Sequence, residues 1–128
     1  MEAVVGTGSS GSRAISNTVG SNDDGFRHVK GFTTGLHQGR QGKHIVGHNN
    51  YQAGKSIIYG GLQEAQALIS EGAGKGIWHA PNKETVSFDH TIGIYISENG
   101  DRSATTMGTI HYSKDGAHIV PSKPKGEI

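Results

Sequence analysis

A run near the C-terminus constrains the fold of this chain more than any other stretch. Residues 108–121, with the sequence GTIHYSKDGAHIVP, alternate between apolar and polar side chains on both sides of Asp115-Gly116. Alternation around an Asp-Gly pair is typical of a β-hairpin with a two-residue turn. The expected partners across this hairpin are Lys114 and Ala117, Ser113 and His118, and His111 and Val120.

Because side chains alternate across a strand, the two faces of the hairpin differ. The polar face carries two imidazoles and two hydroxyls, those of Thr109, His111, Ser113 and His118. The other face is more apolar and consists of Ile110, Tyr112 and Ile119. This arrangement predicts a functional site that rests on a hydrophobic core.

Composition limits the class of protein. The chain has 128 residues, of which 32% are hydrophobic and 21 are glycine, so we expect one domain with a small core and many turns. The absence of cysteine excludes disulfides and thiolate metal ligands. The chain has no apolar run of about 20 residues that would span a membrane, and no signal-peptide pattern. We therefore expect a cytosolic domain or one that is exported with a larger protein.

The first half of the chain contains the predicted helices. Residues 1–24 are rich in Gly, Ser and Asn, so we expect a flexible linker followed by a folded domain over 25–128. Apolar residues at helical spacing predict the main helix from Leu62 to about Gly72. A shorter helical segment is expected around 26–32, and short extended segments are expected at 43–46 and 56–59.

The second half changes to the alternation of strands. Candidate strands occupy 76–79, 85–88, 92–96 and 103–113, with a tight turn at Asn99-Gly100. This order is typical of an α+β fold. We expect N-terminal helical segments packed on a four- to five-stranded antiparallel sheet.

One conflict in the pattern leaves two alternatives open. With a two-residue loop at 99–100, Thr105 lies opposite Ile94, and the isoleucines of that strand share the face of the histidines. A bulge at Gly108 would restore the alternation. A deep site with an apolar floor would also accommodate it.

Positive charge is concentrated in one segment. Residues 25–60 contain no Asp or Glu, but they contain Arg27, Lys30, Arg40, Lys43, Lys55, His28, His37, His44 and His48. A basic, histidine-rich segment suits a partner that carries phosphate. It is equally compatible with an ordinary solvated surface.

Two motif-like patterns lack the context that their motifs require. Residues 47–56 end like a phosphate-binding P-loop, but Asn49 stands where that motif needs glycine, and the residues that follow are a poor helix start. His44 and His48 have the spacing of zinc ligands on a helix, but the residues between them predict an extended segment and a turn. A zinc site made by these two and a third histidine stays open as an alternative.

The remaining polar residues suit acid–base cleavage of RNA. Histidine is the side chain best suited to proton transfer near neutral pH. Cleavage without a metal needs a base for the 2′-hydroxyl, an acid for the leaving 5′-oxygen, and a cation or hydroxyl for the charge that develops on the phosphorane. Such groups are available in Lys43, His44, Thr106, His111 and His118.

Three blocks of sequence resemble the polymorphic toxin type 50 family: residues 41–51 (QGKHIVGHNNY), 82–86 (NKETV) and 105–121 (TTMGTIHYSKDGAHIVP). The resemblance implies the barnase/EndoU/colicin/RelE-like group of small α+β ribonucleases, in which an antiparallel sheet carries the site. It further implies an RNase toxin at the C-terminus of a larger secreted bacterial effector, upstream of residue 1. Such a toxin acts in the cytoplasm of a rival cell, and an immunity protein neutralises it in the producer.

The family pattern covers His44, Thr105, Thr106, His111, Tyr112 and His118, whereas Met107 stands where many relatives have lysine. We expect a metal-independent endoribonuclease without a cofactor that cleaves RNA, with tRNA as one candidate, to a 2′,3′-cyclic phosphate. His44 and His111 are the expected acid–base pair in either order, His118 is a third catalytic or phosphate-binding group, and Thr106 is a transition-state donor. Expected substrate contacts come from Lys43, His48, Asn49, Lys55, Ser56, Tyr112, Ser113 and Lys114.

Two alternatives belong to other classes. The first is a zinc-dependent nuclease that uses His44, His48 and a hairpin histidine. The second is a non-catalytic module that binds RNA or protein. The small number of aromatic residues, three Phe, one Trp and four Tyr, speaks against an RNA-stacking platform.

Overall fold

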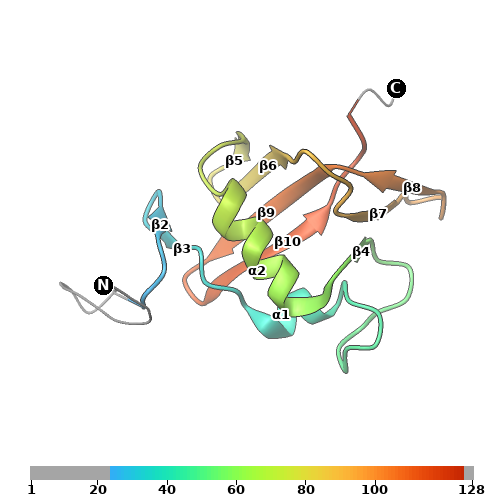
Figure 1. Ribbon diagram of the computed structural model, residues 1–128, viewed down its shortest axis with the longest axis horizontal. Helices are drawn as coiled ribbons and strands as arrows, with labels where there is room; N and C mark the ends of the chain where they lie inside the picture. The colour runs from blue at the N-terminus through green and yellow to red at the C-terminus, as the bar shows by residue number, and fades with distance from the viewer. Residues whose placement is uncertain (1–23, 126–128) are drawn as a thin grey trace.

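The computed structural model describes residues 24–125, so the linker predicted over 1–24 lies outside the described residues except for Asp24. Figure 1 shows the order of the elements. They are β2 (His28–Val29), β3 (Phe32–Thr33), α1 (Gln38–Gly42), β4 (Ile57–Ile58), α2 (Gly61–Gly72), β5 (Ile77–Ala80), β6 (Lys83–Ser87), β7 (Gly93–Ile96), β8 (Arg102–Thr105), β9 (Met107–Ser113) and β10 (Gly116–Pro121). Within 24–125, neither α1 nor α2 has the length and apolar character that crossing a membrane requires.

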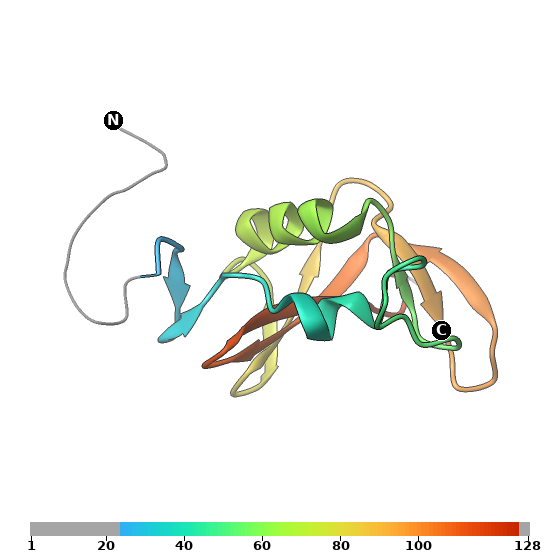
Figure 2. The same cartoon turned by 90° about the horizontal axis from the view of Figure 1, so that it is seen from below.

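Antiparallel pairing joins the strands into three sheets. The largest has four strands in the order β10-β9-β6-β5, the second has three in the order β4-β7-β8, and β2 with β3 forms the third. The helix α2 lies across one face of the four-stranded sheet, and α1 lies beside β10 (Figures 1 and 2). The α+β class is confirmed, but the strands predicted as one meander are divided between two sheets.

This division occurs between β8 and β9. The Thr105 hydroxyl accepts a hydrogen bond from the backbone N–H of Met107 (3.0 Å) and donates one to the carbonyl of Ser122 (2.8 Å). These bonds fix a turn of the backbone at Thr106, because they occupy groups that would otherwise continue the ladder. Consequently β8 leaves the four-stranded sheet and pairs with β7.

The turn between β7 and β8 is longer than the predicted two-residue loop. Ser97 donates its backbone N–H to the carbonyl of Asp101, and Thr105 lies opposite Gly93 rather than Ile94. A shift of one residue exchanges the faces of a strand. This shift, together with the break before β9, removes the conflict over the isoleucines in a way that neither of the two alternatives proposed.

The C-terminal hairpin forms as predicted, but its turn lies one residue earlier in the chain. Residues 114–115 make the loop, and His111 lies directly opposite His118, so each predicted pair is shifted by two residues. Gly116 begins β10 at a φ of +138°, and a Cβ there would lie 3.0 Å from His37, so this glycine allows a close approach rather than the turn. A shift of two residues leaves every side chain on its predicted face.

The prediction of a helix around 26–32 is wrong. This segment forms the hairpin of β2 and β3, since Lys30 (φ 53°) and Gly31 (φ 84°) both have the positive φ that a type I′ turn requires. The extended segment expected at 43–46 is also wrong. There the chain continues from α1 in turns whose N–H groups bond to carbonyls three residues earlier.

The core lies between α2 and the four-stranded sheet. Apolar side chains on one side of the predicted main helix pack against the predicted apolar face of the hairpin, so both predictions are confirmed. The central buried residues are Ala65, Leu68, Ile69, Ile110, Tyr112 and Ile119. The segment predicted as extended at 56–59 contributes β4, whose Ile58 joins this core.

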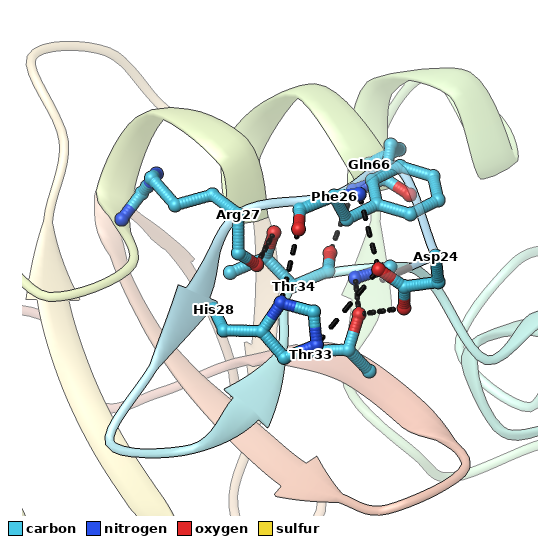
Figure 3. Close-up of polar contacts among 8 residues, drawn as sticks. Asp24, Phe26, Arg27, His28, Thr33, Thr34 and Gln66 are labelled. Atoms are coloured by element: carbon cyan, nitrogen blue, oxygen red, sulfur yellow. Dashed lines mark hydrogen bonds and ion pairs between the residues drawn. The ribbon is translucent and has the colours of Figure 1, made fainter. Parts of the chain in front are cut away.

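The hairpin of β2 and β3 is anchored on α2. The Arg27 guanidinium donates to the carbonyls of Ser70 (2.7 Å) and Ala73 (3.0 Å) at the C-terminal end of that helix, where the helix dipole favours a cation. Gln66 donates to the carbonyl of Thr34 (2.9 Å), and Figure 3 shows this contact beside those of Asp24 and the bond from the Thr34 hydroxyl to the backbone carbonyl of Arg27. The hairpin thus closes one end of the core.

Candidate active site on the open face of the sheet

The face of the four-stranded sheet opposite α2 is polar, and we call it the open face. Strand alternation and register place these side chains on it: Ile77 of β5, Lys83 and Thr85 of β6, Thr109, His111 and Ser113 of β9, and His118 and Val120 of β10. Lys83, His111 and His118 lie directly opposite one another on three neighbouring strands. The open face therefore carries a row of basic side chains across the sheet.

Three imidazoles stack beside one another on this face. The rings of His111 and His118 are 4.8 Å apart between centroids with an interplanar angle of 18°. The ring of His44 lies 6.1 Å from that of His118, again at 18°. We call these three residues the histidine stack. His118 lies in the middle of it, so the structure brings together the three histidines that the sequence singled out.

Gln41 holds His44 against the sheet. Its side chain is fully buried, and its carboxamide makes two hydrogen bonds to one residue of β10: it accepts from the N–H of Ile119 (2.7 Å) and donates to the carbonyl of Ile119 (2.9 Å). The amide thus occupies the edge of β10 as a neighbouring strand would. Because His44 follows Gln41 by three residues and Ile119 follows His118, this clamp fixes the two rings relative to each other.

A second contact orients the His44 ring. Its Nδ1 lies 2.8 Å from the carbonyl oxygen of Ser56. A carbonyl only accepts hydrogen bonds, so Nδ1 carries the hydrogen and, in the neutral ring, Nε2 has the free lone pair. Ser56 itself is buried, and its hydroxyl accepts the N–H of Ile96 (2.9 Å), so it supports the site from inside the fold.

Burial lowers the pKa of all three imidazoles. It is the largest cause for each, and neighbouring positive charges add to it. The pKa of His118 falls to about 3, with the charge of His111 as the next cause, and the pKa of His111 falls to about 4, with the charge of Lys83 as the next cause. The pKa of His44 is lowered too, although its bond to Ser56 opposes the shift. Without a ligand, the three imidazoles are therefore uncharged at pH 7.

Two cations lie close to the histidine stack. Lys83 faces His111 across the strands, and the charge of Arg40 is close enough to lower the pKa of His118. The Arg40 guanidinium donates to the hydroxyl of Ser113 (2.8 Å). Sequence reasoning did not assign either cation to the site. Lys83 would have required knowing that β6 lies next to β9, a long-range pairing that local alternation does not give.

Two of the predicted substrate contacts, both lysines, lie near the stack. The charges of Lys43 and Lys55 are close enough to His44 to lower its pKa. Lys114 is exposed in the hairpin loop, and Ser113 is tied to Arg40. Asn49 is exposed, and the ring of His48 packs against Gly42 and accepts the N–H of Asn50 (2.9 Å).

Two predicted site residues are not brought to the stack. Tyr112 lies on the other face, where it is 2% exposed and its hydroxyl donates to Glu84 (2.7 Å), so it belongs to the core. Thr106 precedes β9, five residues from His111 and therefore about 16 Å away along the strand. The residues of the family pattern thus do not all gather at one place in the fold.

Within residues 24–125, no three His, Cys, Asp or Glu side chains are arranged to hold a metal ion. The alternative zinc site of His44, His48 and a hairpin histidine thus has no ligand cluster there.

Comparison with known families gives one match. The family model described as bacterial toxin 50 matches residues 36–121, which cover α1 to β10 and all three histidines of the stack. Among curated proteins, none matches the chain. The family match covers most of the described residues and leaves out the hairpin of β2 and β3.

Proposed function

The chain belongs to the bacterial toxin 50 family, and on this premise we propose that it is a metal-independent endoribonuclease toxin that cleaves RNA by histidine acid–base catalysis. The observation that carries the proposal is the histidine stack with two cations close to it. Proton transfer at a phosphodiester needs adjacent basic groups of this type, held in a fixed geometry. Solvent-exposed histidines without a catalytic role have no comparable reason to stack on one another or to have lowered pKa values.

The hydrogen bond of His44 supports a role as the general base. With Nδ1 donating to Ser56, the free Nε2 accepts a proton, so His44 serves as the general base for the 2′-hydroxyl. The 2′-oxygen then attacks the phosphorus, the bond to the 5′-oxygen breaks, and the leaving oxygen takes a proton from His111. The products are a 2′,3′-cyclic phosphate and a 5′-hydroxyl, and no bond to water forms in this step.

The central position of His118 suits contact with the phosphate itself. It lies between the proposed base and the proposed acid, so an oxygen of the phosphate that bridges them meets its ring. The nearby Lys83 and Arg40 supply the fixed positive charge that stabilises the phosphorane. An anionic phosphate in the site also raises the pKa of His111 toward the value that an acid needs.

Delivery and regulation are proposed on the basis of the family alone. A toxin domain of this family is proposed to reach the cytoplasm of a rival cell as part of a larger secreted effector, and to be neutralised in the producer by an immunity protein. The proposed substrate is RNA, with tRNA as one candidate.

The test is cleavage by the purified protein of RNA oligonucleotides and total tRNA in excess chelator. We expect fragments that end in a 2′,3′-cyclic phosphate, and no cleavage of oligonucleotides with 2′-deoxyribose throughout. His44→Asn, His111→Asn and His118→Asn are each expected to lower the rate by about 10²- to 10⁴-fold. His90→Asn, which removes an exposed imidazole outside the site, is the matched control and keeps full activity.

Three results would contradict the proposal. Activity that disappears in chelator and returns with Zn²⁺ favours the zinc-dependent alternative. RNA binding without cleavage favours a non-catalytic module. Cleavage of 2′-deoxy substrates shows that the 2′-hydroxyl is not the nucleophile.

A further inference from the structure

The open face continues past the histidine stack to the edge strand β5, where it changes character. Ile77 lies opposite Thr85 and is 76% exposed, the most exposed of the large hydrophobic residues described. Its neighbour on this face is His79, whose Nε2 lies 2.7 Å from the Thr85 hydroxyl. Figure 1 shows β5 at the outer edge of the sheet, next to β6. An apolar side chain, an imidazole and a hydroxyl therefore form one exposed patch.

This patch is connected to the proposed reaction centre by the sheet itself. The Thr85 hydroxyl lies 2.9 Å from that of Thr109, which is two residues before His111 on the same face. The charge of His79 is close enough to lower the pKa of His111. Two strand spacings separate β9 from β5, so the patch begins about 10 Å from His111. A nucleoside joined to a phosphate at His111 reaches this distance.

From this juxtaposition we infer that Ile77, His79 and Thr85 form a subsite for the nucleoside on the leaving-group side of the cleaved phosphate, an inference that rests on the proposed function. Direction follows from the order of residues across the sheet. His44 and His111 lie on opposite sides of His118, and the patch lies on the side of His111. Because His111 protonates the 5′-oxygen, the nucleoside that carries this oxygen leaves on the side of the patch.

The chemistry of the patch fits a nucleobase. Bases offer an apolar face and a polar edge, and side chains that bind them combine a flat or apolar surface with hydrogen-bonding groups. Ile77 and the ring of His79 provide the surface. Nδ1 of His79 has no hydrogen-bonding partner within residues 24–125, so it is available to the edge of a base. Lys83 lies between the patch and His111, where it meets the intervening phosphate or ribose.

The test is a cycle that combines a change in the protein with a change in the substrate. The substrate is an oligonucleotide with one ribonucleotide at a position that the wild type cleaves, made with and without the base on the 3′ side of the cleaved phosphate. Removing this base is expected to lower kcat/KM of the wild type about 5- to 150-fold, the effect measured for single base contacts. In His79→Ala and Ile77→Ser, the same removal is expected to change kcat/KM by less than threefold, since the contact is already lost.

Two controls complete the design. His90→Ala removes an exposed imidazole elsewhere and keeps the full effect of the missing base. Removing the base on the 5′ side of the cleaved phosphate lowers kcat/KM by the same factor in the wild type and in both variants. Circular dichroism confirms that each variant is folded.

The outcomes separate this inference from the proposed function. If the wild type does not cleave RNA, the proposed function fails and the subsite fails with it. Suppose that the wild type cleaves RNA but that removing the 3′ base lowers kcat/KM as much in the variants as in the wild type. The subsite is then overturned, and the proposed function stands. A missing 5′ base that couples to His79 in place of the 3′ base overturns the assigned direction.

Discussion

Each face of the four-stranded sheet buries ionisable groups, but the hydrogen-bond partners of these groups differ between the two faces. On the α2 face, the Glu84 carboxylate is fully buried and accepts hydrogen bonds from the N–H groups of Gly74 (3.0 Å) and Gly76 (2.7 Å) and from the Tyr112 hydroxyl (2.7 Å). On the open face, neither the His111 ring nor the His118 ring is hydrogen-bonded to another residue of 24–125. The strand β9 contributes to both arrangements, with Tyr112 on one face and His111 on the other.

The difference separates a structural group from one available for chemistry. A buried charge with three donors is compensated, and it ties the chain after α2 to the sheet. The half-buried imidazoles are not compensated and are neutral, so their nitrogen atoms are free for a ligand. A phosphate that enters the site supplies the partners that the fold leaves out.

The largest expected effect on stability tests the α2 face. Glu84→Ala leaves three donors without their acceptor, at about 1–3 kcal/mol each, so we expect the free energy of unfolding to fall by about 3 kcal/mol or more. Urea denaturation followed by circular dichroism measures it. Glu98→Ala, at an exposed carboxylate, is the control and changes stability by less than about 0.5 kcal/mol. An equal loss in His118→Asn at pH 7.5 would show that the two faces do not differ as we argue.

The second effect tests the clamp that joins the site to the sheet. In Gln41→Glu, a protonated carboxyl keeps both hydrogen bonds to Ile119, whereas the carboxylate loses the donor and is buried without compensation. We expect kcat/KM to be on the order of 10²-fold below the wild type at alkaline pH, because His44 is displaced. The ratio of variant to wild type should rise toward one as the pH falls.

Gln41→Met is the matched variant for this test, since it fills similar space without hydrogen bonds. Its ratio to the wild type stays low at every pH. A ratio for Gln41→Glu that does not depend on pH would contradict the role of the clamp. Imidazole NMR of the His44 and His118 rings reports displacement directly, separately from any loss of stability.

The third effect is the pH dependence of cleavage. The free enzyme must have an unprotonated base and a protonated acid, and the pKa of His44 lies below 6.5 while that of His111 is about 4. We therefore expect kcat/KM to fall about tenfold for each pH unit above 6.5. Lys83→Gln removes a charge that lowers the pKa of His111, so it moves this decline to higher pH. A rate that rises between pH 6.5 and 8 would contradict the assignment of acid and base.

The smallest effect is the pH dependence of stability. The unfolded chain protonates its histidines near 6.5, but the folded chain protonates His111 only near 4 and His118 only near 3. The unfolded state thus binds more protons in this window, and stability decreases as the pH falls through it. The slope is at most about 1.4 kcal/mol per pH unit for each histidine, and smaller because the rings are partly exposed.

Urea denaturation at pH 6.5, 5.75 and 5.0 measures this slope. His118→Asn is expected to reduce it, and His90→Asn is not. An unchanged slope in His118→Asn would show that this ring is not desolvated in the folded protein.

Local sequence determined the elements whose patterns need no distant partner. The alternation of 108–121 fixed which side chains of the C-terminal hairpin face the core, because a two-residue error in register preserves the faces. The helical spacing after Leu62 likewise predicted α2, because apolar residues on one face of a helix pack against the core. The histidines of the hairpin were identifiable as a polar pair before any fold was known.

Only the tertiary structure decided what surrounds those histidines. Gln41 clamps β10 from 78 residues away, Lys83 reaches His111 through the pairing of β6 with β9, and the Tyr112 hydroxyl finds its acceptor in Glu84 of the neighbouring strand. None of these contacts is local, so no pattern of neighbouring residues encodes them. They arise because a sheet assembles distant strands side by side, and the energy of a buried polar group depends on the partners which that assembly brings to it.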